Sequence, residues 1–133
     1  MRTIEAISGL FIGHDNSLLL LQRNARRTYS PNQWDVMGGD MQPGETPEEV
    51  LHRDAQGKLN IPQVEIFKAT SITYPILSDL IMQRHIFVCS GDYSDIRTNP
   101  KSYQSHGWFG VHEIPKMDLT QGAKAVYQSA FSK

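Results

Sequence analysis

A double glycine, a carboxylate and a lysine are the residues of this chain best suited to chemistry. Gly38 and Gly39 let the backbone approach a ligand closely, because neither carries a side chain. Asp54 and Lys58 stand four residues apart in a segment with helical spacing, so they share a helix face. Carboxylates gathered on one helix can hold Mg²⁺ against a diphosphate, since this ion prefers oxygen ligands and can activate a bound water.

The segment around these residues has the clearest helix signals in the sequence. Thr46, followed three residues later by Glu49, forms a capping box at the start of an apolar periodic stretch. Asn60 can adopt the left-handed conformation that ends a helix. We therefore expect a helix over Pro47–Leu59. The apolar residues at helical spacing are Leu51, Ala55 and Leu59.

Apolar, β-favouring stretches surround this helix on both sides. The four consecutive leucines Leu18–Leu21 suit a strand that is covered on both faces. We expect strands at 4–12, 17–22, 34–37, 67–74, 80–89 and 107–111, and a second helix at 118–131. The first two strands are predicted to form a hairpin, and the third to stop at Gly38. This order of elements predicts a mixed sheet covered by helices.

Length and composition exclude several classes of protein. The 133 residues suit one domain, which we expect to span 1–133. The 13 Lys and Arg against 14 Asp and Glu give a net charge of -1, which argues against a nucleic-acid or membrane-surface binder. The single cysteine, Cys89, excludes an internal disulfide and a Cys-based zinc site, and we expect an inert core thiol. No apolar run reaches the ~20 residues of a membrane span, and no signal peptide is evident, so a cytoplasmic protein is expected.

The stretch Gly39–Ile61 resembles the Nudix box, G-x5-E-x7-R-E-U-x-E-E-x-G-U, where U is a bulky apolar residue. Gly39, Glu45 and Arg53 match in type and spacing, and Asp54 replaces the first glutamate of the R-E pair. With its surroundings, the resemblance covers nearly the whole chain. It implies a Nudix-type α/β/α sandwich and Mg²⁺- or Mn²⁺-dependent hydrolysis of a nucleoside diphosphate linked to another moiety. It also implies a structural ion pair of Glu45 with Arg53 that fixes a loop to the helix.

The box is degenerate at the positions that matter most for metal binding. The two adjacent metal-ligand glutamates of the family fall at Gly57 and Lys58, where the side-chain charge changes from -2 to +1. Asp54 is left as the candidate metal ligand and catalytic carboxylate, and one carboxylate is a poor site for Mg²⁺. Ser105 stands where many family members supply a further acid.

Asp54 and Lys58 have two interpretations. They can form a helix-surface ion pair worth ~0.3–0.5 kcal/mol. Alternatively, the Lys58 ammonium occupies the place of the metal and binds a phosphate directly. The other candidate substrate-binding residues are Gly38, Gly39 and Arg23. Arg23 forms a basic cluster with Arg26 and Arg27; such a cluster is usually a solvated loop, but it can also contact a diphosphate or a ribose-phosphate.

Three functions remain open from the sequence. The first is an enzyme, with weak or unconventional activity, that recruits acids such as Asp40, Asp54, Asp92 or Asp95 to a displaced metal site. The second is a catalytically inactive module that binds a nucleotide or phosphate. The third is an interaction scaffold. A small nucleotide or diphosphate ligand suits the first two; no nucleic-acid or membrane partner is expected, and a homodimer is left open.

Overall fold

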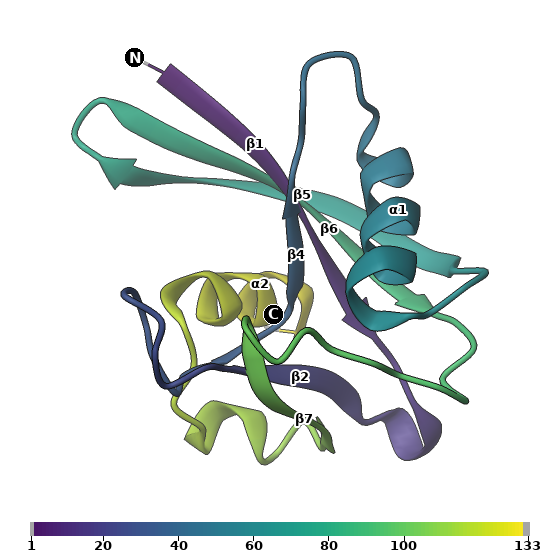
Figure 1. Cartoon of the computed structure of the whole chain (residues 1–133). Helices are drawn as coiled ribbons and strands as arrows, with labels where there is room; N and C mark the ends of the chain where they lie inside the picture. The colour runs from purple at the N-terminus through teal and green to yellow at the C-terminus, as the bar shows by residue number, and fades with distance from the viewer. Residues whose placement is uncertain (1, 132–133) are drawn as a thin grey trace.

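Two β-sheets and two long helices build the part of the chain, residues 2–131, that the computed structural model describes (Figure 1). The strands are β1 (Arg2–Phe11), β2 (Leu18–Arg23), β3 (Trp34–Asp35), β4 (Met37–Asp40), β5 (Glu65–Leu77), β6 (Leu80–Ser90) and β7 (Tyr103–Phe109), and the helices are α1 (Pro47–Leu59) and α2 (Gln121–Phe131). One sheet has the order β4-β1-β6-β5 and the other β3-β2-β7. Because β1 and β6 are parallel and the other pairs antiparallel, the four-stranded sheet is mixed, as predicted.

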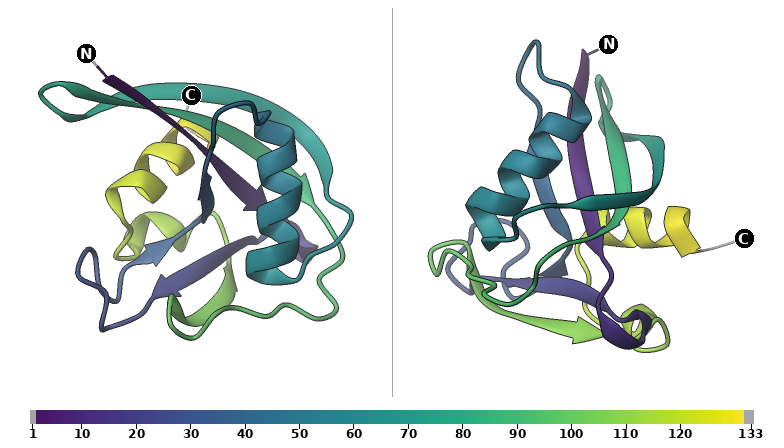
Figure 2. Two further views of the ribbon diagram at one scale, coloured as in Figure 1. Left: turned by 45° about the horizontal axis from the view of Figure 1, so that its top comes forward. Right: turned by 90° about the vertical axis from the view of Figure 1, so that its right-hand side faces the viewer.

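The two helices cover opposite faces of the four-stranded sheet (Figure 2). Ile7 and Phe11 of β1 belong to the apolar cluster that includes the buried face of α1. Leu10 of the same strand belongs to the cluster that includes Ala123 and Val126 of α2. The predicted α/β/α sandwich is therefore confirmed. Neither helix in residues 2–131 combines the length and apolar character needed to cross a membrane.

Strand β2 connects the two apolar clusters. Leu19 and Leu21 pack in the cluster beneath α1, whereas Leu18 and Leu20 pack in the cluster beneath α2. All four side chains are at most 2% exposed. The run of leucines is thus covered on both faces, as its sequence predicted, because successive side chains of a strand point to opposite sides.

Helix α1 begins and ends where its local signals indicated. The Glu49 amide donates to Thr46 Oγ1 at 3.2 Å, and the Thr46 amide donates to Glu49 Oε1 at 3.2 Å. At the other end, Asn60 has a φ of 56°, the left-handed conformation that closes the helix. The predicted boundaries of this helix are confirmed because both ends are set by neighbouring residues.

Two predictions about the strands are wrong. The segments 4–12 and 17–22 do not form a hairpin: β1 pairs with β4 and β6 on its two edges, and only one bridge, between Ile12 and Leu18, joins it to β2. Nor do the glycines end the third strand. Gly38 and Gly39 lie inside β4, where they pair with Ser8 and Ile7 of β1.

Several other boundaries differ from the prediction by one to four residues. Strand β5 continues to Leu77 and β7 begins at Tyr103, because each pairs along its length with a neighbouring strand. Helix α2 begins at Gln121, since Thr120 Oγ1 accepts from the Ala123 amide at 3.0 Å and caps the first turn.

Candidate functional site

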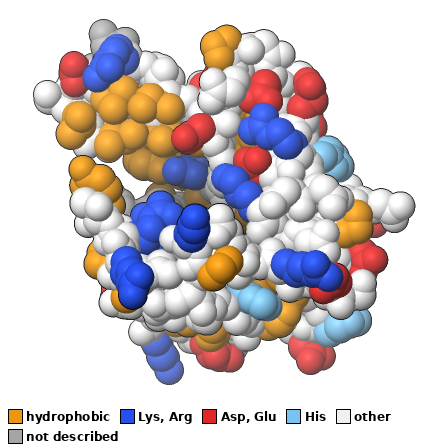
Figure 3. All heavy atoms as spheres, in the orientation of Figure 1, with side chains coloured by type: hydrophobic (Ala, Val, Ile, Leu, Met, Phe, Trp, Pro, Cys, Tyr) orange, Lys and Arg blue, Asp and Glu red, His pale blue; other side chains and the backbone are white. Residues whose placement is uncertain are grey.

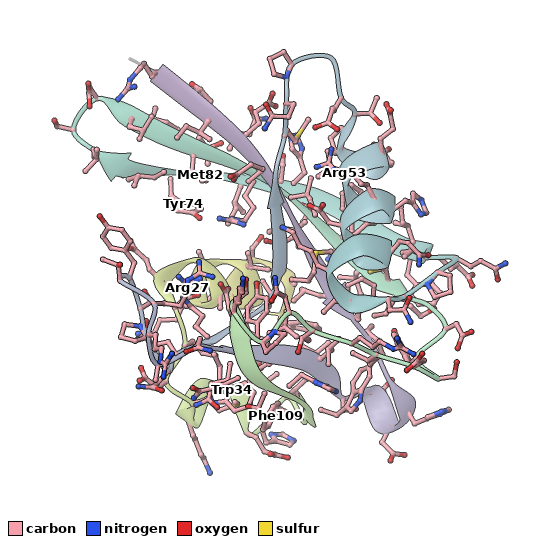
Figure 4. The ribbon with its side chains drawn as sticks, viewed as in Figure 1. Arg27, Trp34, Arg53, Tyr74, Met82 and Phe109 are labelled. Carbon is pink, nitrogen blue, oxygen red and sulfur yellow. The ribbon has the colours of Figure 1, made fainter. Side chains whose placement is uncertain are left out.

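A basic cavity of about 260 Å³ lies beside β4 and α1. It joins a second cavity of about 300 Å³ through four shared residues, and the two form one cleft. Tyr74 and Met82 point from the β5–β6 hairpin into the same cleft that Arg27 lines (Figure 4). Figure 3 shows this hollow between an apolar surface and a group of basic side chains. The smaller cavity is lined by Ala6, Arg23, Arg27, Asp35, Gly38, Gly39, Asp40, Lys58, Arg84 and Tyr103.

Lys58 connects helix α1 to strand β4. Its ammonium donates to the Gly38 carbonyl oxygen at 2.7 Å and lies 3.5 Å from Asp54 Oδ2. The lysine side chain is 43% exposed, whereas the Asp54 side chain is 10% exposed. The interaction is therefore more than the helix-surface ion pair that spacing alone suggested, because it includes a buried carboxylate and a backbone carbonyl of another element.

The Asp54 carboxylate is packed directly against the backbone of β4. A Cβ on Gly39 would lie 1.7 Å from Asp54 Oδ2, so any side chain at this position would collide with the carboxylate. Oδ2 is buried and accepts no hydrogen bond from residues 2–131, and the Lys58 charge is its compensation. Oδ1 accepts from Arg53 Nε at 3.3 Å.

Glu45 and Arg53 are in contact, as the sequence resemblance implies. Arg53 Nη1 donates to Glu45 Oε2. The other carboxylate oxygen of Glu45 accepts from the Gln42 amide at 2.7 Å. The pair thus ties the loop that follows β4 to helix α1, and it orients Arg53 toward Asp54.

The predicted basic cluster is only partly in the cleft. Arg23 and Arg27 line it, but Arg26 does not. Arg23 donates to the Tyr29 carbonyl from Nε and Nη2, at 3.2 and 2.9 Å. Its Nη1 lies 3.9 Å from Asp35 Oδ2, so Arg23 has a partner on each side.

Arg84 and Asp35 are cleft residues that the sequence analysis missed. Arg84 donates to Tyr74 Oη at 3.1 Å and to Ser8 Oγ at 2.9 Å. A single arginine in the apolar run of β6 was the available signal. Burial raises the pKa of the Asp35 carboxyl, although hydrogen bonds from Thr120 and the Val36 amide and the charges of Arg84 and Arg23 oppose this.

The acids proposed for a displaced metal site do not converge. Asp40 lines the basic cavity, but Asp92 lines a different cavity, of about 850 Å³, beside Trp108. Asp95 pairs with Arg97 at 2.8 Å. Within residues 2–131, no three His, Cys, Asp or Glu side chains are grouped as metal ligands. Burial raises the pKa of the Cys89 thiol to about 12, in keeping with the expected core position.

A family model described as the NUDIX domain matches residues 3–130, and the chain therefore belongs to the Nudix family. Members of this family hydrolyse derivatives of nucleoside diphosphates and generally use divalent metal ions.

Two curated relatives illustrate the range of similar proteins. The chain is 24% identical over 127 residues to the nucleoside triphosphatase NudI of Enterobacter sp. (strain 638), covering 87% of this chain and 89% of NudI. It is 27% identical over 101 residues to the NAD-capped RNA hydrolase NudC of Chromobacterium violaceum, covering 76% of this chain. The match spans only 36% of NudC, about a third of that longer protein.

Solved structures share the fold at lower identity. The E. coli ORF135 protein superposes with a TM-score of 0.82 at 20% identity, covering 99% of this chain and 91% of that one. A MutT NUDIX hydrolase from Burkholderia pseudomallei gives 0.75 at 17% identity, covering 96% and 98%. These likenesses support the fold described above.

The α1 face carries fewer carboxylates than the resemblance to the Nudix box implies. Mg²⁺ and Mn²⁺ prefer several oxygen ligands. Of the box positions that carry the metal-ligand glutamates in the family, only Asp54 keeps a carboxylate, and the Lys58 ammonium already contacts that carboxylate. A cation there would meet a like charge.

Two glycine substitutions should have opposite effects on stability. Gly57 has open space where a Cβ would lie, so Gly57→Ala should raise the free energy of unfolding by about 0.5–1 kcal/mol through helix propensity. Gly39→Ala should lower it by about 1–3 kcal/mol, because the Cβ would displace Asp54. Urea unfolding of both variants measures this; equal effects would contradict the packing of Asp54 against β4.

Anion binding should depend on the protonation of Asp35. Because burial raises the pKa of this carboxyl above the ordinary 3.8, the charge is lost while the pH is still above that value. Sulfate, whose charge does not change in this pH range, should bind at least about fivefold more tightly once Asp35 is neutral. Removing the repulsion between two unit charges ~4 Å apart in water is already worth about 1 kcal/mol, and sulfate carries two charges. Titrations with Asp35→Asn should lack this pH-dependent gain. If sulfate affinity depended on pH in the same way in the unmodified protein and in Asp35→Asn, the predicted effect of the Asp35 charge on anion binding would be contradicted.

Proposed function

We propose that this Nudix domain binds the phosphates of a small nucleotide in the basic cleft and that its metal-dependent hydrolysis is weak or lost. The observation that carries the proposal is the lining of the 260 Å³ cavity. Four cationic side chains and the Gly38–Gly39 backbone face it, against the two carboxylates Asp35 and Asp40. A cavity with this charge balance attracts phosphate groups, and arginine is well suited to binding them through paired donors.

The second cavity supports a ligand with more than a phosphate. Tyr74, Pro75, Ile76 and Met82 provide aromatic and apolar surface next to Arg84. A nucleoside attached to a phosphate chain has the same polarity, with an aromatic base at one end and charge at the other. The relatives named for nucleoside triphosphates and NAD-capped RNA act on ligands of this general kind.

Helix α1 supports the loss of hydrolysis. Gly57 and Lys58 replace the glutamates that carry the metal in the resembling family, and the remaining carboxylate, Asp54, is compensated by Lys58. Nothing on this face supplies the several oxygen ligands that would hold a metal and activate a water.

Arg27→Gln should weaken the binding of nucleoside di- and triphosphates. Arg27 lines the cavity, so the loss of a charged hydrogen bond should lower affinity about tenfold, near the low end of the 1.5–3 kcal/mol expected for such bonds. Arg26→Gln is the matched control, since its side chain is exposed outside the cavity. Calorimetric titration with a nucleotide panel in EDTA measures both. Equal losses, or no nucleotide binding by the unmodified protein, would refute the proposal.

Turnover of the same panel in Mg²⁺ or Mn²⁺ tests the second half of the proposal. The unmodified chain should release product slowly or not at all, and the double variant Gly57→Glu/Lys58→Glu should release it at least tenfold faster, because two carboxylates return to the helix face. Gly57 has open space around it, so its glutamate can be accommodated. Rapid turnover by the unmodified chain, abolished by Asp54→Asn, would instead establish an unconventional metal site.

A further inference from the structure

We infer that the Lys58 ammonium takes the place of a divalent cation in this cleft. The ammonium occupies the cation position and binds phosphate itself. The inference rests on the proposed function, because it names the group that takes over the role of a metal ion in the same site. It starts from the oxygen atoms around Lys58 Nζ. These are the Gly38 carbonyl at 2.7 Å and the Asp54 carboxylate at 3.5 Å.

Both oxygens are of the kinds that bind hard cations. Carboxylate and backbone carbonyl oxygens are typical ligands of Mg²⁺ and Ca²⁺. Here they belong to different elements, α1 and β4, and the absence of a side chain at Gly39 allows the carboxylate to reach the strand. The ammonium thus lies where a cation would join the two elements. A divalent ion seeking the same oxygens would be repelled by it.

Lys58 keeps capacity to bind a ligand. An ammonium has three N–H donors. The Gly38 carbonyl accepts a hydrogen bond from one of them at 2.7 Å, and even with a second directed toward Asp54 at ion-pair distance, one donor is left for a ligand. The side chain is 43% exposed and lines the basic cavity, so this donor can be offered to a phosphate oxygen. Arg53, whose contacts are with Glu45 and Asp54, does not line this cavity.

The first part of the test is Mn²⁺ binding without any nucleotide, measured through the electron paramagnetic resonance signal of free Mn²⁺. The unmodified protein should bind Mn²⁺ at least tenfold more weakly than Gly57→Glu/Lys58→Glu. Tight Mn²⁺ binding by the unmodified protein that Asp54→Asn removes would overturn the inference and leave the phosphate-binding proposal intact.

The second part is pyrophosphate binding in EDTA, measured by calorimetry. Lys58→Met should lower the affinity about tenfold, and Lys58→Arg should restore most of it. Lys124→Met, the same change at an exposed lysine of α2, should leave it unchanged. The urea unfolding of Lys58→Met is measured in parallel. A purely structural role of Lys58 would lower the free energy of unfolding of this variant and leave its pyrophosphate affinity unaltered. Full pyrophosphate affinity in folded Lys58→Met would overturn the inference, whereas no binding by any of these proteins would overturn the proposed function.

Discussion

The burial of the Asp54 carboxylate against strand β4 constrains the rest of the site. A buried carboxylate is costly unless a positive charge or hydrogen bonds compensate it. Arg53 approaches one oxygen and Lys58 the other, from the preceding residue and from one helical turn later. Arg53 is in turn held by Glu45, which fixes the loop after β4. One carboxylate therefore determines the positions of the loop, the helix and the strand that border the cleft.

The same carboxylate explains the double glycine. In the sequence, Gly38 and Gly39 suggested a break at which the backbone meets a ligand. In the fold they are paired strand residues. Gly39 is required because Asp54 occupies the space of its Cβ, and Gly38 presents its carbonyl to Lys58. The close approach to the backbone that the two glycines allow is therefore used by the α1 side chains Asp54 and Lys58.

Sequence reasoning succeeded where the determining contacts are local. The capping box at Thr46 and the left-handed Asn60 lie next to the helix ends that they define. The hairpin prediction failed because the partners of β1 are β4 and the distant β6, and parallel pairing with β6 leaves no local signal. Asp35 and Arg84 were missed for the same reason, since only tertiary packing brings them to the cleft that Arg23 and Lys58 also line.

Strand β2 gives the molecule a particular kind of cooperativity. Its four leucines alternate between the two apolar clusters, so neither cluster can lose its packing while the strand stays in place. Unfolding is then a single event for both layers. A ligand that binds only the folded cleft protects the whole domain through mass action, including the backbone amides of α2 beyond Gln121 and Gly122, the two residues of that helix that line the cleft.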